Sequence, residues 1–350
     1  MPPLSAPETL RVGLAQIAPV FLDRAVTLAR VIARIEEAAA AGCRLVCFGE
    51  SLVPGYPFWL SLTHGSRFDD PMQKRLHAHY LREAVQIERG DLDAVRACAK
   101  THGISVYLGI VERPSDRGGH SLYCSLVYVD TEGVIRSVHR KLQPTYEERL
   151  AWAPGDGHGL VTHACGPFTV GGLNCWENWM PLARAALHAR GENLHVAVWP
   201  GAVRNTVDVT RFVAVEGRSY VVSVSGVLRV GDIPEGVPYR EEIVAAVRAN
   251  EGGGVNRGPS GESSLSIPLG GHGAESPGFI ADGGSCVAGP DGAWVLAPVR
   301  GERGVFVVDL DVGRVREERQ NFDISGHYSR PDVLRLSVGG ERQGVVADVK

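Results

Sequence analysis

The apolar positions at the start of the chain follow two different periods. Residues 11–20 are mostly apolar, which predicts a strand, whereas residues 26–42 are apolar every three to four positions, which predicts an amphipathic helix ending at Gly42. A second apolar run, 44–50, predicts another strand. A strand, a helix and a strand in close succession form a βαβ unit, so we expect parallel strands in a covered sheet.

Strand-like and helix-like periods alternate along the rest of the chain. They predict two hairpins, 121–141 with its turn at Thr131–Gly133 and 284–299 with its turn at Pro-Asp-Gly, and a closing strand and helix over 304–320. The other predicted strands are 104–112, 168–175, 195–201 and 221–228, and the other predicted helices are about 70–101, 180–191 and 210–220. This alternation in both halves predicts a layered α/β fold.

The segment from about 229 to 277 departs from that alternation. It is rich in glycine from residue 252 onward and shows no sustained apolar period, so we expect a long surface loop. Neither a repeat nor a Ser/Gly linker requires a second domain.

Charge and hydropathy narrow the classes of partner. The net charge of −4 and the pI near 6.3 offer no basic surface for nucleic acid or an anionic membrane. No apolar run has the length of a membrane-spanning helix, and the first residues do not resemble a secretory signal. These patterns favour a cytoplasmic protein.

The seven cysteines are scattered along the chain and odd in number, which favours reduced thiols over a disulfide framework. The spacing of Cys43 and Cys47 could suggest a metal site. Both lie in an apolar run without a second ligand pair, so we interpret them as small buried thiols and predict no metal.

Three reactive side chains follow predicted strands: Glu50, Lys141 and Cys175. Each alone has an ordinary explanation, as a turn residue, a solvated strand end or a buried thiol. The carboxyl ends of strands in α/β sheets are where sites are built, however, so the three can converge.

Cys175 is the strongest single candidate because it ends a strand shortly before a helix. Helix dipoles and a nearby cation lower the pKa of a thiol, so we predict an accessible thiolate nucleophile. A histidine base is the alternative; His139 and His158 lie closest in sequence, but neither ends a strand as Glu50 does. A desolvated Glu50 with a raised pKa, facing Lys141, would complete a charge-balanced set.

Four sequence motifs resemble those of the nitrilase (carbon-nitrogen hydrolase) superfamily. Phe-Gly-Glu at 48–50 is followed by Pro-Gly-Tyr-Pro at 54–57, and His-Arg-Lys-Leu at 139–142 leads to Glu-Glu-Arg at 147–149. Asn-Cys-Trp-Glu-Asn lies at 174–178, and Gly-His-Tyr-Ser-Arg-Pro at 326–331. The motifs occur in the superfamily's order.

This resemblance implies a four-layer αββα sandwich. It implies a single domain over residues 8–335, with the glycine-rich insertion at about 229–277 and a C-terminal tail at 336–350. One departure is Gly49, where the superfamily usually has proline; a looser backbone at Glu50 is the expected, small effect.

The resemblance also implies roles for the reactive residues. Glu50 would be the general base, Cys175 the nucleophile and Lys141 the cation that stabilises the tetrahedral intermediate, helped by the backbone N–H of Trp176. Glu148 matches a second glutamate that orients the lysine or the water, and Glu147 is interpreted as a solvated charge. The mechanism needs no cofactor and no metal.

Four aromatic residues and one proline near these motifs are candidates for the substrate-binding wall, because apolar and aromatic surface in a cleft suits an organic nitrile. Each could instead be an ordinary core residue, and for Trp199 alone the two interpretations have equal weight. The candidates are Tyr56, Trp152, Trp176, Trp199 and Pro200.

The leading hypothesis is a nitrilase that converts a small organic nitrile to its carboxylic acid and ammonia, because Trp176-Glu177 after the cysteine is typical of that branch. An amidase or a nitrile-hydrating enzyme is the alternative, distinguished by its products. A non-catalytic scaffold of the same fold is disfavoured, because Glu50, Lys141 and Cys175 are all present. The resemblance further implies a homodimer or a larger homo-oligomer.

Overall fold

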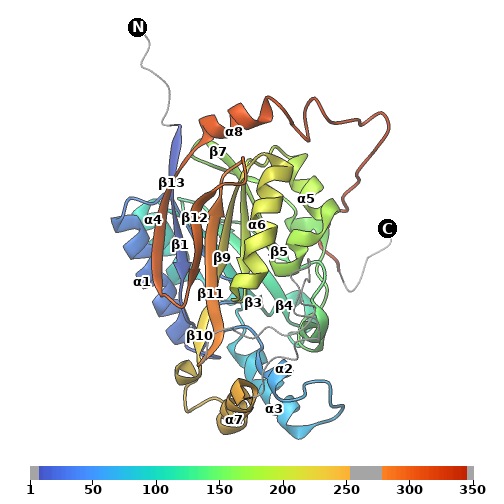
Figure 1. Cartoon of the computed structure of the whole chain (residues 1–350). Coiled ribbons are helices and arrows are strands. Elements are labelled where there is room, and N and C mark those ends of the chain that lie inside the picture. Colours follow the sequence, from blue (N-terminus) through green and yellow to red (C-terminus); the bar gives the residue numbers. More distant parts are fainter. Residues whose placement is uncertain (1–7, 253–277, 345–350) are drawn as a thin grey trace.

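Two β-sheets pack face to face and carry helices on their outer faces. The structure is a computed structural model that describes residues 8–252 and 278–344 (Figure 1). Figure 1 shows α1 and α4 on one side of the paired sheets and α5 and α6 on the other. This arrangement confirms the predicted αββα sandwich.

The first sheet has the strand order β13-β1-β2-β3-β4-β5. Its parallel centre, β1–β2–β3, is extended by antiparallel β13, β4 and β5. The bounds of its strands are β1 Thr9–Gln16, β2 Leu45–Phe48, β3 Ser105–Glu112, β4 Tyr123–Val129, β5 Ile135–Arg140 and β13 Gly304–Asp311.

The second sheet has the strand order β10-β11-β9-β8-β7-β6, with β12 also paired to β11. Strands β7, β8 and β9 are parallel, so both sheets have parallel centres. The bounds are β6 His163–Cys165, β7 Phe168–Asn174, β8 Leu194–Trp199, β9 Tyr220–Ser225, β10 Val227–Arg229, β11 Phe279–Ala288 and β12 Trp294–Arg300.

The helices cover these sheets or lie at one end of them. The α-helices are α1 Arg24–Ala40, α2 Trp59–Leu62, α3 Pro71–Glu83, α4 Asp93–His102, α5 Pro181–His188, α6 Val203–Gly217, α7 Arg240–Gly252 and α8 Val312–Arg319. Short 3₁₀ helices are η1 Ile87–Arg89, η2 Ser115–Arg117, η3 Tyr146–Leu150, η4 Gly157–Gly159, η5 Cys175–Trp179 and η6 Val230–Asp232. In the described part of the chain, the helices are too short or too polar to cross a bilayer.

Three apolar layers hold the sandwich together. Side chains from both sheets, such as Val12 and Val196, fill the space between the sheets. Val31 and Ile35 of α1 pack with α4 against the outer face of the first sheet. Val209 of α6 packs against the outer face of the second. Because each sheet is covered on both faces, its central strands are apolar throughout, as the sequence pattern indicated.

The predicted helix over 70–101 is wrong in its middle. It is two helices, α3 and α4. Between them Val85 is extended and forms a bridge with Glu112 of β3, and the short helix η1 follows. The apolar period continues across the break because Val85 is buried there as well.

The prediction of a loop throughout 229–277 is also wrong in part. Residues Arg240–Gly252 form α7, which buries Ile243, Val244 and Val247 in the cluster that also holds α2 and α3. The apolar period of this helix was missed in the sequence analysis because residues 229–277, which include the glycine-rich stretch, were treated as one segment. The glycine-rich stretch itself, 253–277, lies outside the described residues.

The described part of the C-terminal tail contacts an earlier segment of the same chain. Arg342 donates a hydrogen bond to Asp156 over 3.0 Å and another to the carbonyl of Val138 over 2.8 Å. These contacts tie the tail to β5 and to the segment that follows it.

Candidate active site

Cys175 lies at a sharp turn where β7 ends. Its φ of 47° is in the left-handed region, which is costly for a residue with a Cβ and is found where a structure must aim a side chain. The turn continues as the short helix η5, and Glu177 accepts a hydrogen bond from the N–H of Asn174 over 2.9 Å, which closes the turn.

Glu50 follows β2 in the other sheet. Its N–H donates to the carbonyl of Trp199 at the end of β8 over 3.2 Å, so the second sheet fixes its backbone. Gly109 on β3 makes room, since a Cβ there would lie 2.2 Å from the carbonyl oxygen of Gly49. At Gly49 itself, a Cβ would lie only 3.0 Å from the Trp199 carbonyl oxygen. The backbone that aims Glu50 is therefore closely packed on two sides.

Lys141 follows β5 and connects two carboxylates. Its Nζ donates to Oε1 of Glu50 over 2.9 Å and to Oε2 of Glu148 over 2.7 Å, and all three side chains are fully buried. The sulfur of Cys175 and a carboxylate oxygen from each of Glu50 and Glu148 lie within 4.8 Å of one another. The structure thus brings together the four residues that the sequence singled out.

Both carboxylate oxygens of Glu148 already accept hydrogen bonds. Besides Lys141, its Oε2 accepts from the N–H of Thr145 over 2.6 Å, and its Oε1 accepts from the hydroxyl of Tyr56 over 2.8 Å. In contrast, Oε2 of Glu50 has no hydrogen-bond partner among the described residues. Of these two carboxylates, Glu50 has the oxygen available to take a proton. Neighbouring Glu147 is partly exposed.

The burial of two carboxylates beside one ammonium sets the protonation of the group. Burial raises the pKa of Glu50 to about 7, against the attraction of Lys141 and with the added repulsion of Glu148. Burial alone would lower the pKa of Lys141, but the two carboxylates raise it well above its usual value, so the ammonium keeps its charge.

The prediction of a thiolate at Cys175 is wrong for this arrangement. Burial and the carboxylate of Glu50 raise the pKa of the thiol well above its usual value, although Lys141 and the N–H of Trp176 oppose them. The helix α5 begins only at Pro181, six residues after Cys175, and the effect of a helix dipole falls off within about one turn, so it does not lower the pKa of the thiol. The thiol is neutral at rest and needs a base when it reacts.

Two carboxylates and a thiol are also donors that a metal ion could use. Here the ammonium of Lys141 lies between the carboxylates and supplies the positive charge. A cation added at this point would be repelled by Lys141.

Cys124 on β4 is a neighbour that the sequence analysis missed. Its thiol lies 3.5 Å from Oε1 of Glu50 and 3.9 Å from Oδ1 of Asn174. Its backbone carbonyl accepts the N–H of Lys141 over 2.8 Å. In the sequence, Cys124 is only one of several apolar positions in a predicted strand. Cys43 and Cys47 also lie in an apolar run, and these two side chains are part of the core.

Glu177 was likewise given no role of its own in the sequence analysis and was named only as part of a motif. It is buried and accepts hydrogen bonds from the N–H of Leu142 over 2.5 Å and from His139 over 3.1 Å, besides that of Asn174. Despite burial, His139 and these N–H groups lower its pKa, so Glu177 is ionised. One carboxylate therefore ties the turn carrying Cys175 to His139 and Leu142, which lie on either side of Lys141 in the sequence.

The five residues predicted for the substrate wall fall in different places. Tyr56 and Pro200 line a cavity of about 10 Å³ beside Glu50. Trp152 lies edge-on to Tyr56, with ring centroids 5.6 Å apart, and its ring is 5.8 Å from Nζ of Lys141.

The other two tryptophans lie on the side of the second sheet that faces α6. Trp199 is fully buried in that cluster, and its indole N–H donates to Ser223 over 3.3 Å. Its side chain is thus a core residue, while its carbonyl holds Glu50. Trp176 is partly buried and packs against the same cluster.

Comparison with known proteins agrees with this geometry. The carbon-nitrogen hydrolase family matches residues 11–320. The chain is 31% identical over 338 residues to nitrilase 2 from an unknown prokaryotic organism, covering 95% of this chain and 94% of that protein. It is 30% identical to an arylacetonitrilase of Hypocrea virens, covering 97% and 94%, and 29% identical to an aliphatic nitrilase of Rhodococcus rhodochrous, covering 94% and 82%.

Solved structures share the fold at lower identity. A carbon-nitrogen hydrolase from Helicobacter pylori G27 aligns with a TM-score of 0.63 at 17% identity, over 93% of this chain and 96% of that one. An amidase from Nesterenkonia sp. aligns with a TM-score of 0.58 at 18% identity, over 91% and 97%. The chain belongs to the carbon-nitrogen hydrolase family, and its class is that of hydrolases acting on carbon-nitrogen bonds.

Proposed function

We propose that this protein is a nitrilase, which hydrolyses a small organic nitrile to a carboxylic acid and ammonia with Cys175 as the nucleophile. The observation that carries the proposal is the ammonium of Lys141, shared between Glu50 and Glu148 beside the sulfur of Cys175. This arrangement provides a nucleophile, a base and a fixed positive charge in a buried space.

The reaction begins with a neutral thiol. The free Oε2 of Glu50 takes the proton of Cys175 as the sulfur bonds to the nitrile carbon. One carbon-nitrogen π bond breaks, and the nitrogen receives that proton to give a thioimidate. A pKa near 7 lets Glu50 accept and return a proton at neutral pH.

Two molecules of water complete the reaction. The first adds to the thioimidate carbon and gives one proton through Glu50 to the nitrogen. The hydroxyl group of the resulting tetrahedral intermediate then passes its proton to the nitrogen as the carbon-nitrogen bond breaks, which releases ammonia and leaves a thioester. The second attacks the thioester, releases the carboxylic acid and returns the proton to the sulfur. Lys141 and the N–H of Trp176 stabilise the negative charge of the tetrahedral intermediates.

Glu148 acts on the reaction through Lys141. Its oxygens are occupied by Lys141, Tyr56 and the N–H of Thr145, so it orients the ammonium rather than a water molecule. Tyr56 in turn fixes Glu148 and lines the cavity beside Glu50, which at about 10 Å³ must widen before a substrate can contact Tyr56 there.

The choice of a nitrile over an amide rests on the relatives. Proteins named nitrilase, arylacetonitrilase and aliphatic nitrilase align over most of this chain at about 30% identity. Their names span aromatic and aliphatic substrates, so the class of nitrile is left to experiment.

Benzonitrile, phenylacetonitrile and butyronitrile, each offered beside the corresponding amide, test the proposal. Ammonia, acid and amide are quantified for every substrate. We expect acid and ammonia from at least one nitrile, and hydroxylamine added during turnover should trap the thioester as a hydroxamate. Hydrolysis of amides without turnover of any nitrile would reject the nitrilase in favour of an amidase.

We also infer a homo-oligomer located in the cytoplasm. Leu182 of α5 and Phe212 and Val215 of α6 expose apolar surface on one side of the molecule, and a second copy could cover it. All seven cysteines are unpaired, as is typical of a reducing compartment. Light scattering on the purified protein measures the assembly, and a Leu182→Glu variant should shift it toward the monomer.

A further inference from the structure

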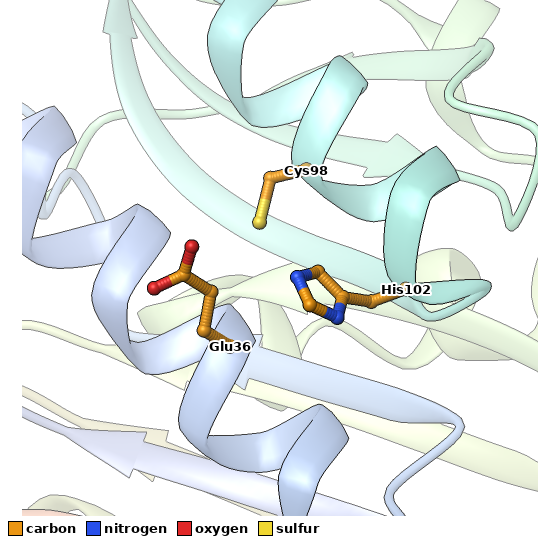
Figure 2. A group of neighbouring side chains, drawn as sticks. All are labelled: Glu36, Cys98 and His102. Carbon is orange, nitrogen blue, oxygen red and sulfur yellow. The ribbon is translucent and has the colours of Figure 1, made fainter.

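A second group of reactive side chains lies on the outer face of the first sheet. Cys98 and His102 are one turn apart on α4, so they share a face of that helix, and Glu36 reaches the same point from the neighbouring helix α1 (Figure 2). The two helices pack closely, as the Cys98 sulfur lies 4.0 Å from the Ile32 carbonyl oxygen of α1.

We propose that Glu36, Cys98 and His102 form a binding site for a transition-metal ion of the Zn²⁺ type. One oxygen, one sulfur and one nitrogen of these side chains lie within 4.8 Å of one another. Around a tetrahedral zinc ion, such donors are roughly 3.4–3.6 Å apart, as ordinary zinc-ligand bond lengths require. Small rotations of the side chains of Glu36 and His102 would therefore bring the three donors to an ion.

Two of the donors are free to make that movement. Glu36 and His102 are exposed, and within residues 8–252 and 278–344 neither side chain has a hydrogen-bond or ion-pair partner. Cys98 is held by packing, since it is only 9% exposed and belongs to the apolar cluster under α1. The site thus combines one fixed sulfur with two adjustable donors.

The donor set selects the kind of ion. A thiolate and an imidazole favour Zn²⁺, Co²⁺ and similar ions over Mg²⁺ or Ca²⁺, which prefer oxygen ligands. As the sulfur-metal bond forms, the thiol of Cys98 loses its proton to solvent. Burial and the carboxylate of Glu36 raise the pKa of that thiol, and a bound cation would offset both effects.

The position of the site separates it from the reaction. Glu36 lies near the end of α1, before β2 begins, and His102 ends α4, before β3 begins. Glu50, in contrast, follows the carboxyl end of β2. The two groups therefore lie at opposite ends of the same strand, and we expect a bound ion to join α1 to α4 and stabilise the fold, with turnover unchanged.

The test uses Co²⁺ as a spectroscopic probe on the full chain with Cys175→Ala, which removes the thiol of the active site. We expect one equivalent of Co²⁺ to bind with a sulfur-to-cobalt charge-transfer band. The band should be lost when His102→Ala or Cys98→Ala is added. His120→Ala, which removes another exposed histidine, is the matched control and should keep the band.

A second measurement follows thermal unfolding with and without Zn²⁺. The Cys175→Ala protein should unfold at a higher temperature when Zn²⁺ is present, and addition of His102→Ala should abolish that increase. The proposal is overturned if the Cys175→Ala protein gives no charge-transfer band, or if the band persists after His102→Ala. Because neither readout involves turnover, this result is independent of the proposed nitrilase activity.

Discussion

The active-site group and the group between α1 and α4 use the same kinds of side chain in opposite surroundings. Each contains a thiol and at least one carboxylate with donor atoms within 4.8 Å. In the first, Glu50, Glu148 and Cys175 are buried around the ammonium of Lys141. In the second, Glu36 and His102 are exposed, and Glu36 has no ion-pair partner among the described residues.

The difference between the two groups shows that a fixed cation decides whether a thiol and a carboxylate serve catalysis or can bind a metal ion. A buried lysine neutralises the carboxylates, leaves one carboxylate oxygen free as a base and offers its charge to a developing anion. Without a lysine, the same donors remain open to a positive ion from solution. A thiol beside a carboxylate is therefore not by itself a sign of catalysis; the neighbouring charge has to be identified.

The largest contrast should come from removing each thiol in turn. Cys175→Ala should lower kcat by at least about 10⁴-fold, because no other group can form the covalent intermediate. Cys98→Ala should change kcat by less than about twofold, since the side chain lies away from Glu50 and only a small volume is lost. Ammonia release measures both, and circular dichroism checks folding. Full activity of Cys175→Ala would end the thiol mechanism.

The next contrast compares the two carboxylates. Glu50→Gln keeps the shape of the side chain but removes the base, and we expect kcat to fall by about 10²–10⁴-fold. Glu36→Gln removes an exposed carboxylate and should leave kcat unchanged. Single-turnover kinetics separate thioimidate formation from its hydrolysis. Equal activity of the two variants would mean that Glu50 is not the base.

Acidification should weaken the reaction through the same residue. The pKa of Glu50 is raised to about 7, and only its ionised form accepts a proton, so kcat/KM should fall about tenfold per pH unit below that value. Above it, kcat/KM should level off. Initial rates from pH 5 to 8 measure the profile, with circular dichroism at each pH. A flat profile in folded protein would contradict a base of this kind.

The smallest catalytic effect concerns Glu177, a positioning residue. Glu177→Gln keeps the size of the side chain but weakens the bonds that hold Leu142 and Asn174, and we expect kcat to fall by about 10–100-fold with little change in KM. The rate at which iodoacetamide alkylates Cys175 should change as well. Glu132→Gln, an exposed turn position, is the matched control. A variant that loses only stability would make Glu177 merely structural.

Much of the fold was predictable because covered sheets leave a clear trace in the sequence. The central parallel strands of both sheets appear in the sequence as apolar runs separated by segments with a helical period. The resemblance to a known superfamily predicted that the two sheets pack face to face. The errors arose where tertiary contacts override local period. Val85 is extended because it pairs with Glu112, and nothing near residue 85 in the sequence reveals that partner.

The site was predictable to the extent that its residues end strands. Glu50, Lys141 and Cys175 were singled out for that reason, and the structure brings them together. The protonation of Cys175 was not predictable, since it depends on burial and on carboxylates from distant segments. The cluster on α1 and α4 was hidden for a similar reason: Cys98 and His102 are one turn apart, but Glu36 joins them only through helix packing.

The origin of the reactive groups in different sheets has one more consequence. Glu50 and Lys141 belong to the first sheet and Cys175 to the second, so the reaction requires the two halves of the chain to be assembled correctly. A partly unfolded form could keep every strand and still be inactive. Turnover can therefore serve as a sensitive assay of native assembly, and selection for activity in a variant library would also select for correctly joined layers.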